Sequence, residues 1–563
     1  MKKATGILLA AVLTACGGGG GGNQGGDNTG QPPVVKPDPG PGGTGDSSIL
    51  AFDPPRLEAI AIQGEPLKLQ VVGTASLSIQ EQLNLRLEAS SDFSTEVTME
   101  RLDSHRYLAQ LKTAENGAPG VRSGFINVSL CRDDPKVCAS PYPGSPWKLP
   151  YQLNILSTAD NLKPLGKLEG ASDWSNVQGN AGHTGRVETS TRLDPANFSL
   201  RWMRSAPAGN QGIYSEVLVK GSRVFYNSQT LLDKVVMALD EKEGSVAWSQ
   251  SLDLIGNPVL SAGYLVAQTK EPNSSLTKFM DLQTGKVILQ ENISRRPGTN
   301  FSWLTGDDHS VYPSNPLRRV DTKTATPQWE KADNESGMLV LHSPLTAIDT
   351  KHVYAILVRF NHNAYPDQFL EISRIDDGSR VALIADPQPF TNDFVAGAPG
   401  ISVLDGADRV ITARHSAGNG SISSFSISQN KRLWTKNLSF HSAPVVSNGV
   451  VYLAAPDPNS TIATQLHAYD GDTGSLLWSM RLPNDTVVPY RWGSDFGYQI
   501  IAINNLLFIS SVTQEKGNRT YAIDPATRKI VWQFPSAGRL SASANGLLHI
   551  ARPDGKLLAV HLN

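Results

Sequence analysis

Short runs of alternating apolar and polar side chains follow the first fifty residues of the chain. Five such runs lie at residues 67–72, 83–87, 107–111, 124–130 and 149–155. A period of two places every second side chain on the same face, which is typical of a half-buried β-strand. Turn residues separate the runs, so we expect residues 49–157 to form a β-sandwich.

A second pattern recurs through the rest of the chain. Its clearest copies start at Ala238, Ala468 and Ala522, with an Asp two residues later and a Trp ten residues later. Eight copies, centred on positions 240, 281, 321, 376, 426, 470, 524 and 561, have a mean spacing of about 46 residues. A further hairpin precedes each copy, and four strands in ~40–50 residues are typical of one propeller blade. We therefore expect residues 158–563 to form an all-β, eight-bladed β-propeller.

The eighth copy stops at residues 558–563, before an outermost strand could follow. The run at residues 198–202 lies near the start of the region and would supply that strand. A ring closed by strands from both ends of its sequence leaves no exposed edge at the closure. We therefore expect residues 198–202 to pair with the last strand.

The repeat Ala-x-Asp-x-x-x-Gly-x-x-x-Trp resembles that of pyrroloquinoline quinone (PQQ) type propellers, and residues 173–185 resemble their start. The resemblance implies that each Trp packs between neighbouring blades against a glycine backbone, with its N–H on a carbonyl oxygen. These docking residues are Trp202, Trp248, Trp329, Trp434, Trp478 and Trp532. The sandwich resembles immunoglobulin-like or fibronectin-like domains in architecture alone, because it has no Cys…Trp…Cys spacing.

The PQQ-type family has a catalytic and a non-catalytic branch. Some members are periplasmic dehydrogenases that hold PQQ and Ca²⁺ on the axis, whereas the BamB-like lipoproteins bind no cofactor. Alcohol dehydrogenases of this type carry adjacent cysteines, and the propeller region here has no Cys. Carboxylate pairs such as Asp307-Asp308 lie in predicted turns, where Asp is common for local reasons. We expect His183 to fix the segment before the first blade. The chain is thus predicted to have no catalytic, cofactor-binding or metal-binding residues; the alternative is a PQQ-dependent dehydrogenase.

The N-terminus has the pattern of an export signal. Lys2 and Lys3 precede an apolar run at residues 4–15, which is too short to span a bilayer. Leu13-Thr-Ala-Cys16 resembles a bacterial lipobox, which implies a signal peptide at 1–15 and lipidation of Cys16. The alternative is an ordinary secretory signal with an incidental Cys. Residues 16–48 are rich in Gly and Pro and are predicted to be a disordered tether.

Two cysteines remain, Cys131 and Cys138. An exported chain enters an oxidising compartment, so this pair predicts one disulfide that closes a short loop. A metal site is disfavoured, because no Cys or His pair repeats the spacing.

Charge and repeat together restrict the function. The chain has 50 Lys and Arg against 52 Asp and Glu, which argues against nucleic-acid binding through bulk positive charge. The first hypothesis is a lipid-anchored scaffold at the outer membrane, with a protein partner such as the β-barrel assembly machinery. The second is an adhesion or glycan-binding protein that faces the periplasm or the cell surface. Tyr490, Arg491, Trp492 and Phe496 form an aromatic and basic cluster that would contact a partner; the alternative is that they pack on their own blade.

Overall fold

The computed structural model is nearly all β, which confirms the predicted fold class. In the part of the chain that it describes, no helix is long and apolar enough to cross a membrane. The predicted signal peptide, Cys16, the tether and the loop cluster at 490–496 lie outside the described residues. Those residues are 49–206, 212–213, 215–229, 234–271, 274–292, 304–314, 316–332, 334–335, 337–343, 345–360, 367–386, 400–406, 408–416, 419–457, 464–483, 500–511 and 518–563.

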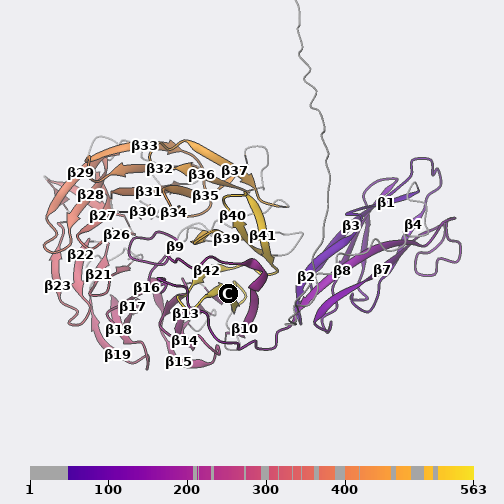
Figure 1. Ribbon diagram of the computed structural model, residues 1–563, viewed down its shortest axis with the longest axis horizontal. Coiled ribbons are helices and arrows are strands. Elements are labelled where there is room, and N and C mark those ends of the chain that lie inside the picture. The colour runs from indigo at the N-terminus through magenta and orange to yellow at the C-terminus, as the bar shows by residue number, and fades with distance from the viewer. Residues whose placement is uncertain are drawn as a thin grey trace, which may run out of the picture. The chain divides into compact units, whose positions relative to one another are not determined.

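Two four-stranded sheets form the N-terminal region (Figure 1). One has the order β1 (Leu50–Asp53), β3 (Lys68–Ala75), β6 (Arg106–Lys112) and β5 (Thr98–Arg101). The other has the order β2 (Leu57–Ile62), β8 (Trp147–Leu156), β7 (Gly120–Cys131) and β4 (Asn84–Glu88). Both sheets contribute to one apolar core, in which Leu111, Ile126 and Leu153 are fully buried. The predicted alternation therefore corresponds to inward-facing and outward-facing rows.

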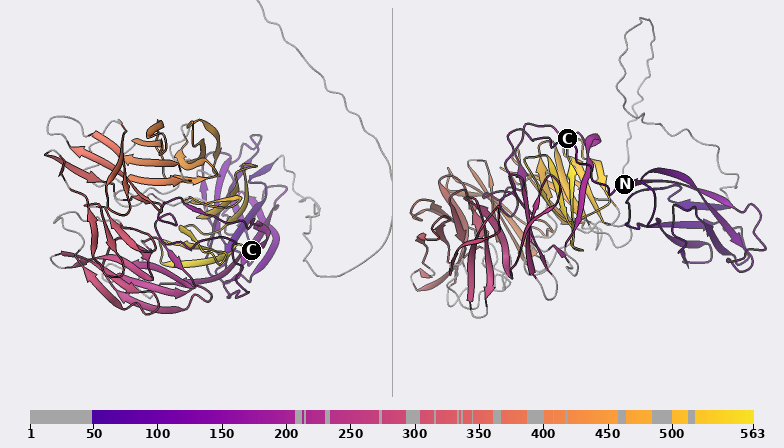
Figure 2. Two further views of the ribbon diagram at one scale, coloured as in Figure 1. Left: turned by 60° about the vertical axis from the view of Figure 1, so that its left-hand side comes forward. Right: turned by 90° about the horizontal axis from the view of Figure 1, so that it is seen from below.

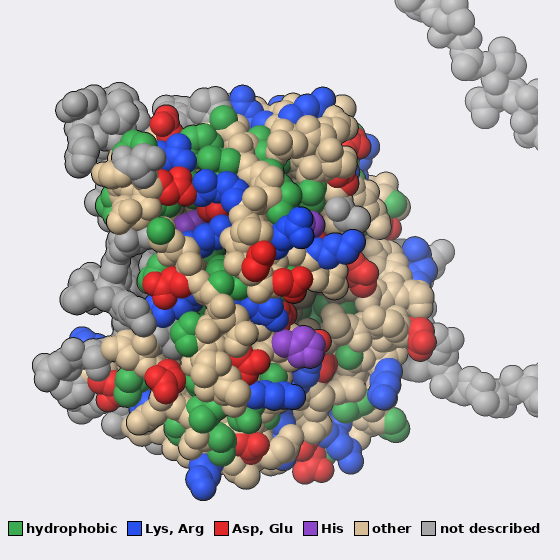
Figure 3. Space-filling model, turned by 90° about the vertical axis from the view of Figure 1, so that its left-hand side faces the viewer, with side chains coloured by type: hydrophobic (Ala, Val, Ile, Leu, Met, Phe, Trp, Pro, Cys, Tyr) green, Lys and Arg blue, Asp and Glu red, His purple; other side chains and the backbone are tan. Residues whose placement is uncertain are grey.

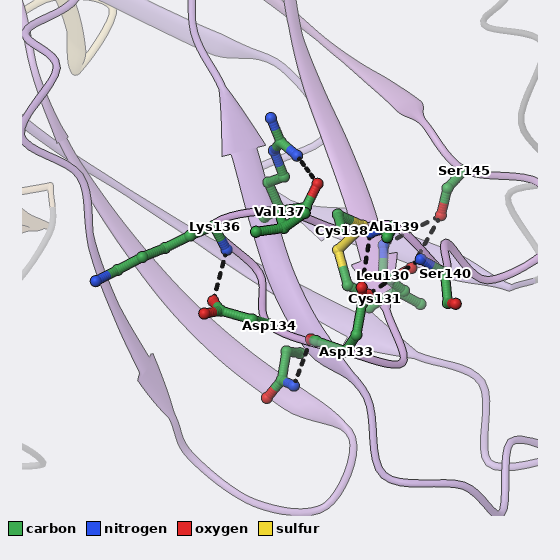
Figure 4. The surroundings of a disulfide bond; sticks show 12 residues. Leu130, Cys131, Asp133, Asp134, Lys136, Val137, Cys138, Ala139, Ser140 and Ser145 are labelled. Atoms are coloured by element: carbon green, nitrogen blue, oxygen red, sulfur yellow. Dashed lines mark hydrogen bonds between the residues drawn. A yellow bond between two sulfur atoms is a disulfide. The ribbon is translucent and has the colours of Figure 1, made fainter.

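A disulfide joins Cys131, at the end of β7, to Cys138 (Figure 4). The carboxylate of Asp133 accepts hydrogen bonds from the backbone N–H groups of Ala139 and Ser140, at 2.7 and 3.2 Å. The predicted disulfide is thus present, and side-chain-to-backbone bonds hold the loop that it closes.

Within residues 186–563, the described strands form eight more sheets around a common axis (Figure 1). We number them in chain order. Sheet one has β11 (Gly212–Ile213), β12 (Leu218–Lys220), β13 (Arg223–Gln229), β14 (Lys234–Asp240) and β15 (Val246–Ser251). Sheet two has β16 (Leu254–Ser261), β17 (Tyr264–Glu271), β18 (Ser274–Asp281) and β19 (Val287–Glu291). Sheet three has β20 (Leu304–Gly306), β21 (Ser310–Pro313), β22 (Arg318–Asp321) and β23 (Pro327–Glu330). Sheet four has β24 (Asn334–Glu335), β25 (Met338–His342), β26 (Ala347–Ile348), β27 (His352–Phe360), β28 (Asp367–Arg374) and β29 (Arg380–Ala385).

The second half of the ring follows the same plan. Sheet five has β30 (Gly400–Asp405), β31 (Arg409–Ser416), β32 (Asn419–Ser426) and β33 (Lys431–Asn437). Sheet six has β34 (Val445–Ser447), β35 (Val450–Pro456), β36 (Thr464–Asp470) and β37 (Leu476–Arg481). Sheet seven has β9 (Arg186–Val187), β38 (Ile500–Ile503), β39 (Leu506–Ser511), β40 (Arg519–Asp524) and β41 (Lys529–Phe534). Sheet eight has β10 (Ser199–Ser205), β42 (Arg539–Ala542), β43 (Leu547–Ala551) and β44 (Lys556–His561). A 3₁₀ turn, η1 (Pro195–Asn197), precedes β10.

Strand β10 closes the ring as the sequence predicts. It pairs antiparallel with β44, with Ser199 opposite His561 and Ser205 opposite Lys556, at the edge of sheet eight. In sheets two, five and six the first strand lies innermost, as β16, β30 and β34 do, whereas β10 lies on the outside of sheet eight (Figures 1 and 2). Most residues of the inner strands are buried, and the four residues of β38 are all apolar and buried, so the faces of successive sheets bury one another.

Candidate functional site

Four of the predicted docking tryptophans bond to the next sheet around the ring. Each indole N–H donates to a backbone carbonyl at the turn between the last two strands of that sheet, at 2.8–3.0 Å. The donor and acceptor pairs are Trp202 and Glu241, Trp248 and Leu282, Trp329 and Ile375, and Trp434 and Gly471. These bonds make the tryptophans structural, as the resemblance implies.

A glycine in the same turn allows the indole to approach. Gly244 and Gly285 have φ of +67° and +69°, and a Cβ on either would lie 2.8 or 2.6 Å from the ring of Trp202 or Trp248. A Cβ on Gly378 or Gly474 would likewise come too close to the ring of Trp329 or Trp434. Any larger residue would therefore collide with the indole as well as strain the backbone.

Trp478 and Trp532 have different surroundings. In the next sheet around the ring, sheet seven, the corresponding turn carries Arg528, at φ +58°, where the turns that face the four tryptophans above have Gly. The ring of Trp478 lies 5.9 Å from that of Tyr452. Trp532 packs edge-on against Phe198, at 5.3 Å, and stacks on Phe534, at 5.5 Å. Phe198, which directly precedes the ring-closing strand β10, thus supplies an aromatic ring for the last tryptophan of the repeat.

Residues 174–187, which we call the axial segment, cross the middle of the ring (Figure 1). Seven inner strands donate backbone N–H groups to this segment in chain order, one from each of sheets one to seven, at 2.7–3.1 Å. Six of the acceptors are backbone carbonyls, and the third is the side-chain oxygen of Asn176. The donors are Val219, Leu260, Gly306, Ile348, Leu404, Val446 and Ala502. The axial segment therefore connects these seven sheets, six of them through its own backbone and sheet three through the side chain of Asn176.

Asn176 and His183 fasten the axial segment through their side chains. The amide of Asn176 accepts from Gly306 N and donates to Gly306 O, at 2.7 and 2.9 Å. His183 is fully buried, with Nδ1 2.8 Å from Val177 O and Nε2 3.0 and 3.1 Å from Thr305 Oγ1 and Thr346 O. Burial lowers the pKa of His183 to about 4, so it is neutral at pH 7. Both ring nitrogens contact protein groups, in agreement with the expected positioning role.

Two polar side chains of the axial segment are bonded to the chain itself. Trp174 Nε1 donates to Glu216 Oε1 at 3.0 Å, and Gln178 Nε2 donates to Pro444 O at 3.1 Å. Among the described residues, no group of three His, Cys, Asp or Glu side chains could hold a metal ion.

The carboxylates singled out from the sequence fix turns. Asp470 Oδ1 accepts from the N–H groups of Asp472 and Thr473, and hydrogen bonds from Thr473 lower the pKa of Asp470. Asp307 Oδ1 accepts from two N–H groups of its own turn, at 2.7 Å. These side chains are therefore engaged in local structure, as their positions in turns predict.

Charged side chains of both signs are interspersed over the side of the molecule shown in Figure 3. This agrees with the near-balance of acidic and basic residues in the whole chain. No broad surface of one sign is visible on this side.

Comparison with known proteins gives one family and several structures. The family model described as outer membrane protein assembly factor BamB matches residues 177–312, 304–480 and 418–562. Quinohemoprotein alcohol dehydrogenase from Comamonas testosteroni is similar at 13% identity and a TM-score of 0.51, over 69% of this chain and 80% of that one. The Dos1 propeller is similar at 12% identity and a TM-score of 0.46, over 66% and 96%. No curated protein matches the chain in sequence. At 13% identity, the dehydrogenase shows the propeller fold alone.

Proposed function

Because the chain belongs to the family of outer membrane protein assembly factor BamB, we propose that it is a non-catalytic, lipid-anchored scaffold that binds proteins at the outer membrane. Its role would be to aid the assembly of outer-membrane proteins. The family match over residues 177–562 carries this proposal.

The use of the axis by the chain itself supports a scaffold. The axial segment takes one backbone N–H from each of seven inner strands, and His183 is buried and neutral. The loops and rims of the ring are then the surfaces left for ligands, and propellers with such surfaces commonly bind proteins.

The N-terminal sequence supports the place of action. The lipobox-like residues before Cys16 predict a membrane anchor, and several acyl chains hold a protein on a bilayer stably. Residues 16–48 would let the folded part stand roughly 30 Å from the membrane as a flexible chain. Tyr490, Arg491, Trp492 and Phe496 remain the predicted partner-contact cluster.

Capture from native membranes tests the proposal. A C-terminally tagged chain would be cross-linked briefly in its own cells and purified, beside a Cys16→Ser variant that cannot be acylated. We expect components of the β-barrel assembly machinery to be enriched with the wild type and reduced with Cys16→Ser. Arg491→Ala with Trp492→Ala should lower that enrichment, whereas the paired change Lys242→Ala with Glu243→Ala, in an exposed turn of sheet one, should not.

A second function is favoured by the N-terminal sandwich. Domains of this architecture often serve as adhesion modules, and all four residues of its edge strand β5 are exposed. Recovery of cell-wall or external partners alone, without assembly components, would contradict the scaffold and support adhesion or glycan binding.

A further inference from the structure

A cleft of about 540 Å³ lies between sheets five and six. Asp405 and Arg409 line it from the hairpin of β30 and β31, and Asp472 lines it from the turn after β36. Its volume falls within the range of roughly 300–1,000 Å³ that is usual for ligand sites. Gly406 and Gly449 also line it, and a Cβ on either would meet no atom within 4 Å. The wall therefore has open space beside both glycines.

The repeat shows what an aspartate at the Asp405 position normally does. In sheet three, Asp307 accepts two N–H groups of its turn and the hydroxyl of Tyr312, which donates at 2.8 Å. In sheet four, Asp349 accepts two N–H groups of its turn at 2.6 Å and the hydroxyl of Tyr354 at 2.7 Å. In both sheets the carboxylate is satisfied within its own hairpin.

Asp405 lacks this arrangement. In the pairing of β30 with β31, Asp405 stands opposite Arg409, four residues later in the chain. In sheet three the backbone N–H of Asp307 donates to the carbonyl of Ser310, only three residues later. The position of the tyrosine is taken by Ile411, which stands opposite Val403 and cannot donate a hydrogen bond. Asp405 is only 8% exposed, and its Oδ2 has no hydrogen-bond partner. A buried carboxylate oxygen in this state is costly.

Arg409 neutralises the cleft only in part. Its Nη1 lies 3.1 Å from Asp405 Oδ2, and its Nη2 lies 3.1 Å from Asp472 Oδ1, but Nη1 makes no hydrogen bond. A Cβ at Gly471 would lie 1.9 Å from Nη1, so only glycine leaves room for this guanidinium. Burial raises the pKa of Asp405 despite the attraction of Arg409 and Arg186. Arg186, on the axial segment, is itself paired with Glu188.

The charged residues that line the cleft indicate the charge of the ligand that it would bind. Asp405, Asp408 and Asp472 line the cleft, and Arg409 is the one cation among the described residues that line it. A second cation would complete the bonding of Asp405 Oδ2 and use the remaining acceptor capacity of Asp472, whose side chain is 72% exposed. We propose that this cleft binds a basic side chain, arginine or lysine, presented by a partner protein. The choice of a protein as the source of the cation rests on the proposed function.

Calorimetric titration of the purified full chain tests the cleft. A Cys16→Ser version avoids the lipid, and the probe is the capped tripeptide Gly-Arg-Gly, beside its lysine version and an uncharged norleucine version. We expect the arginine and lysine peptides to bind and the norleucine peptide not to bind. Asp405→Asn should weaken binding at least tenfold, because it removes the buried negative charge while keeping the shape.

Two controls keep the result decisive. Asp308→Asn removes the same charge from an 85% exposed side chain on sheet three, and it should leave the affinity unchanged. Asp405→Asn should unfold at the same urea concentration as the parent or a higher one, so a loss of binding would not reflect a loss of folding. Absence of binding to the parent, or equal weakening by both variants, would overturn the proposal. Binding of spermidine without binding of either basic peptide would overturn the assignment to a protein partner.

This titration is independent of the membrane experiment. A cleft that fails to bind peptides would leave the capture of assembly components untouched, and a failed capture would leave the titration unaffected.

Discussion

Replacement of Glu241 with glutamine should stabilise the propeller at neutral and alkaline pH. Glu241 is fully buried between sheets one and eight, where its Oε2 accepts from Asn545 Nδ2 at 2.6 Å. Its Oε1 has no hydrogen-bond partner and lies 3.7 Å from Nε2 of the buried His549. A glutamine keeps an acceptor for Asn545 and cannot ionise.

The magnitude follows from the pKa of Glu241. Burial raises this pKa from 4.5 to about 7, so the folded protein keeps the proton where the unfolded chain has lost it. The stability from this proton is complete below pH 4.5 and is lost as the pH rises through about 7. At about 1.4 kcal/mol for each pKa unit, the wild type loses about 3 kcal/mol by pH 8. Glu241→Gln avoids this loss.

The comparison must be made between variants at each pH, because His549 acts in the opposite direction. Burial lowers the pKa of His549 to about 3, so stability falls as the pH drops below 6.5. Subtraction of the wild-type value from that of Glu241→Gln at the same pH removes the part of this contribution that does not depend on residue 241.

Urea unfolding of the full chain, followed by tryptophan fluorescence between pH 4.5 and 8.5, measures the difference. We expect Glu241→Gln to exceed the wild type by about 3 kcal/mol at pH 8 and to converge with it near pH 4.5. Glu243→Gln, an exposed neighbour in the same turn, should show no such trend. A difference that stays constant across the pH range would refute the reasoning.

Three further predictions concern residues that hold the fold. Trp202→Ala should cost about 3–5 kcal/mol in urea unfolding, because a fully buried indole and its bond to the next sheet are lost; a cost below about 1 kcal/mol would contradict a docking role. Asn176→Ala should cost about 2–4 kcal/mol, because it leaves the N–H and carbonyl of Gly306 buried without partners; the Gly306 amide should also exchange with solvent faster, and unchanged exchange would count against it. The double change Cys131→Ser with Cys138→Ser should destabilise the sandwich by about 2–3 kcal/mol, as expected for so short a loop; a shift of the propeller transition instead would be inconsistent.

Much of the propeller could be predicted because its packing residues are large and periodic. A tryptophan recurs eight residues after a turn aspartate, and four of the docking tryptophans pack against a glycine of the next sheet. The pairing of β10 with β44 followed from a strand missing at one end and a spare strand at the other. Both signals lie in side chains, which a sequence displays directly.

The axial segment could not be predicted in the same way, because backbone groups make most of its bonds. Carbonyls of Trp174, Ala181 and Gly185 accept N–H groups from three different sheets, and any residue can offer a carbonyl. The sequence signals were in side chains: the resemblance of residues 173–185 and the expected positioning role of His183 pointed to this segment. The bonds of Asn176 to the backbone of Gly306 were not expected. The short strands β24 and β25 were missed because they have only two and five residues, too few to show a period.

The cleft at Asp405 was hidden for a different reason. An aspartate in a turn is ordinary, and only a comparison with Asp307 and Asp349 in three dimensions shows that its usual partners are missing.

The axial segment also has a consequence for the order in which the molecule can fold. It is synthesised before all seven strands that donate to it, and the last of these donors is Ala502. Contacts between residues so distant in sequence form slowly, because long loops must close before any bond is gained. A chain that is still emerging can thus build single sheets but cannot complete its centre. We expect folding to end in one late step, in which the centre and the β10–β44 seam form together.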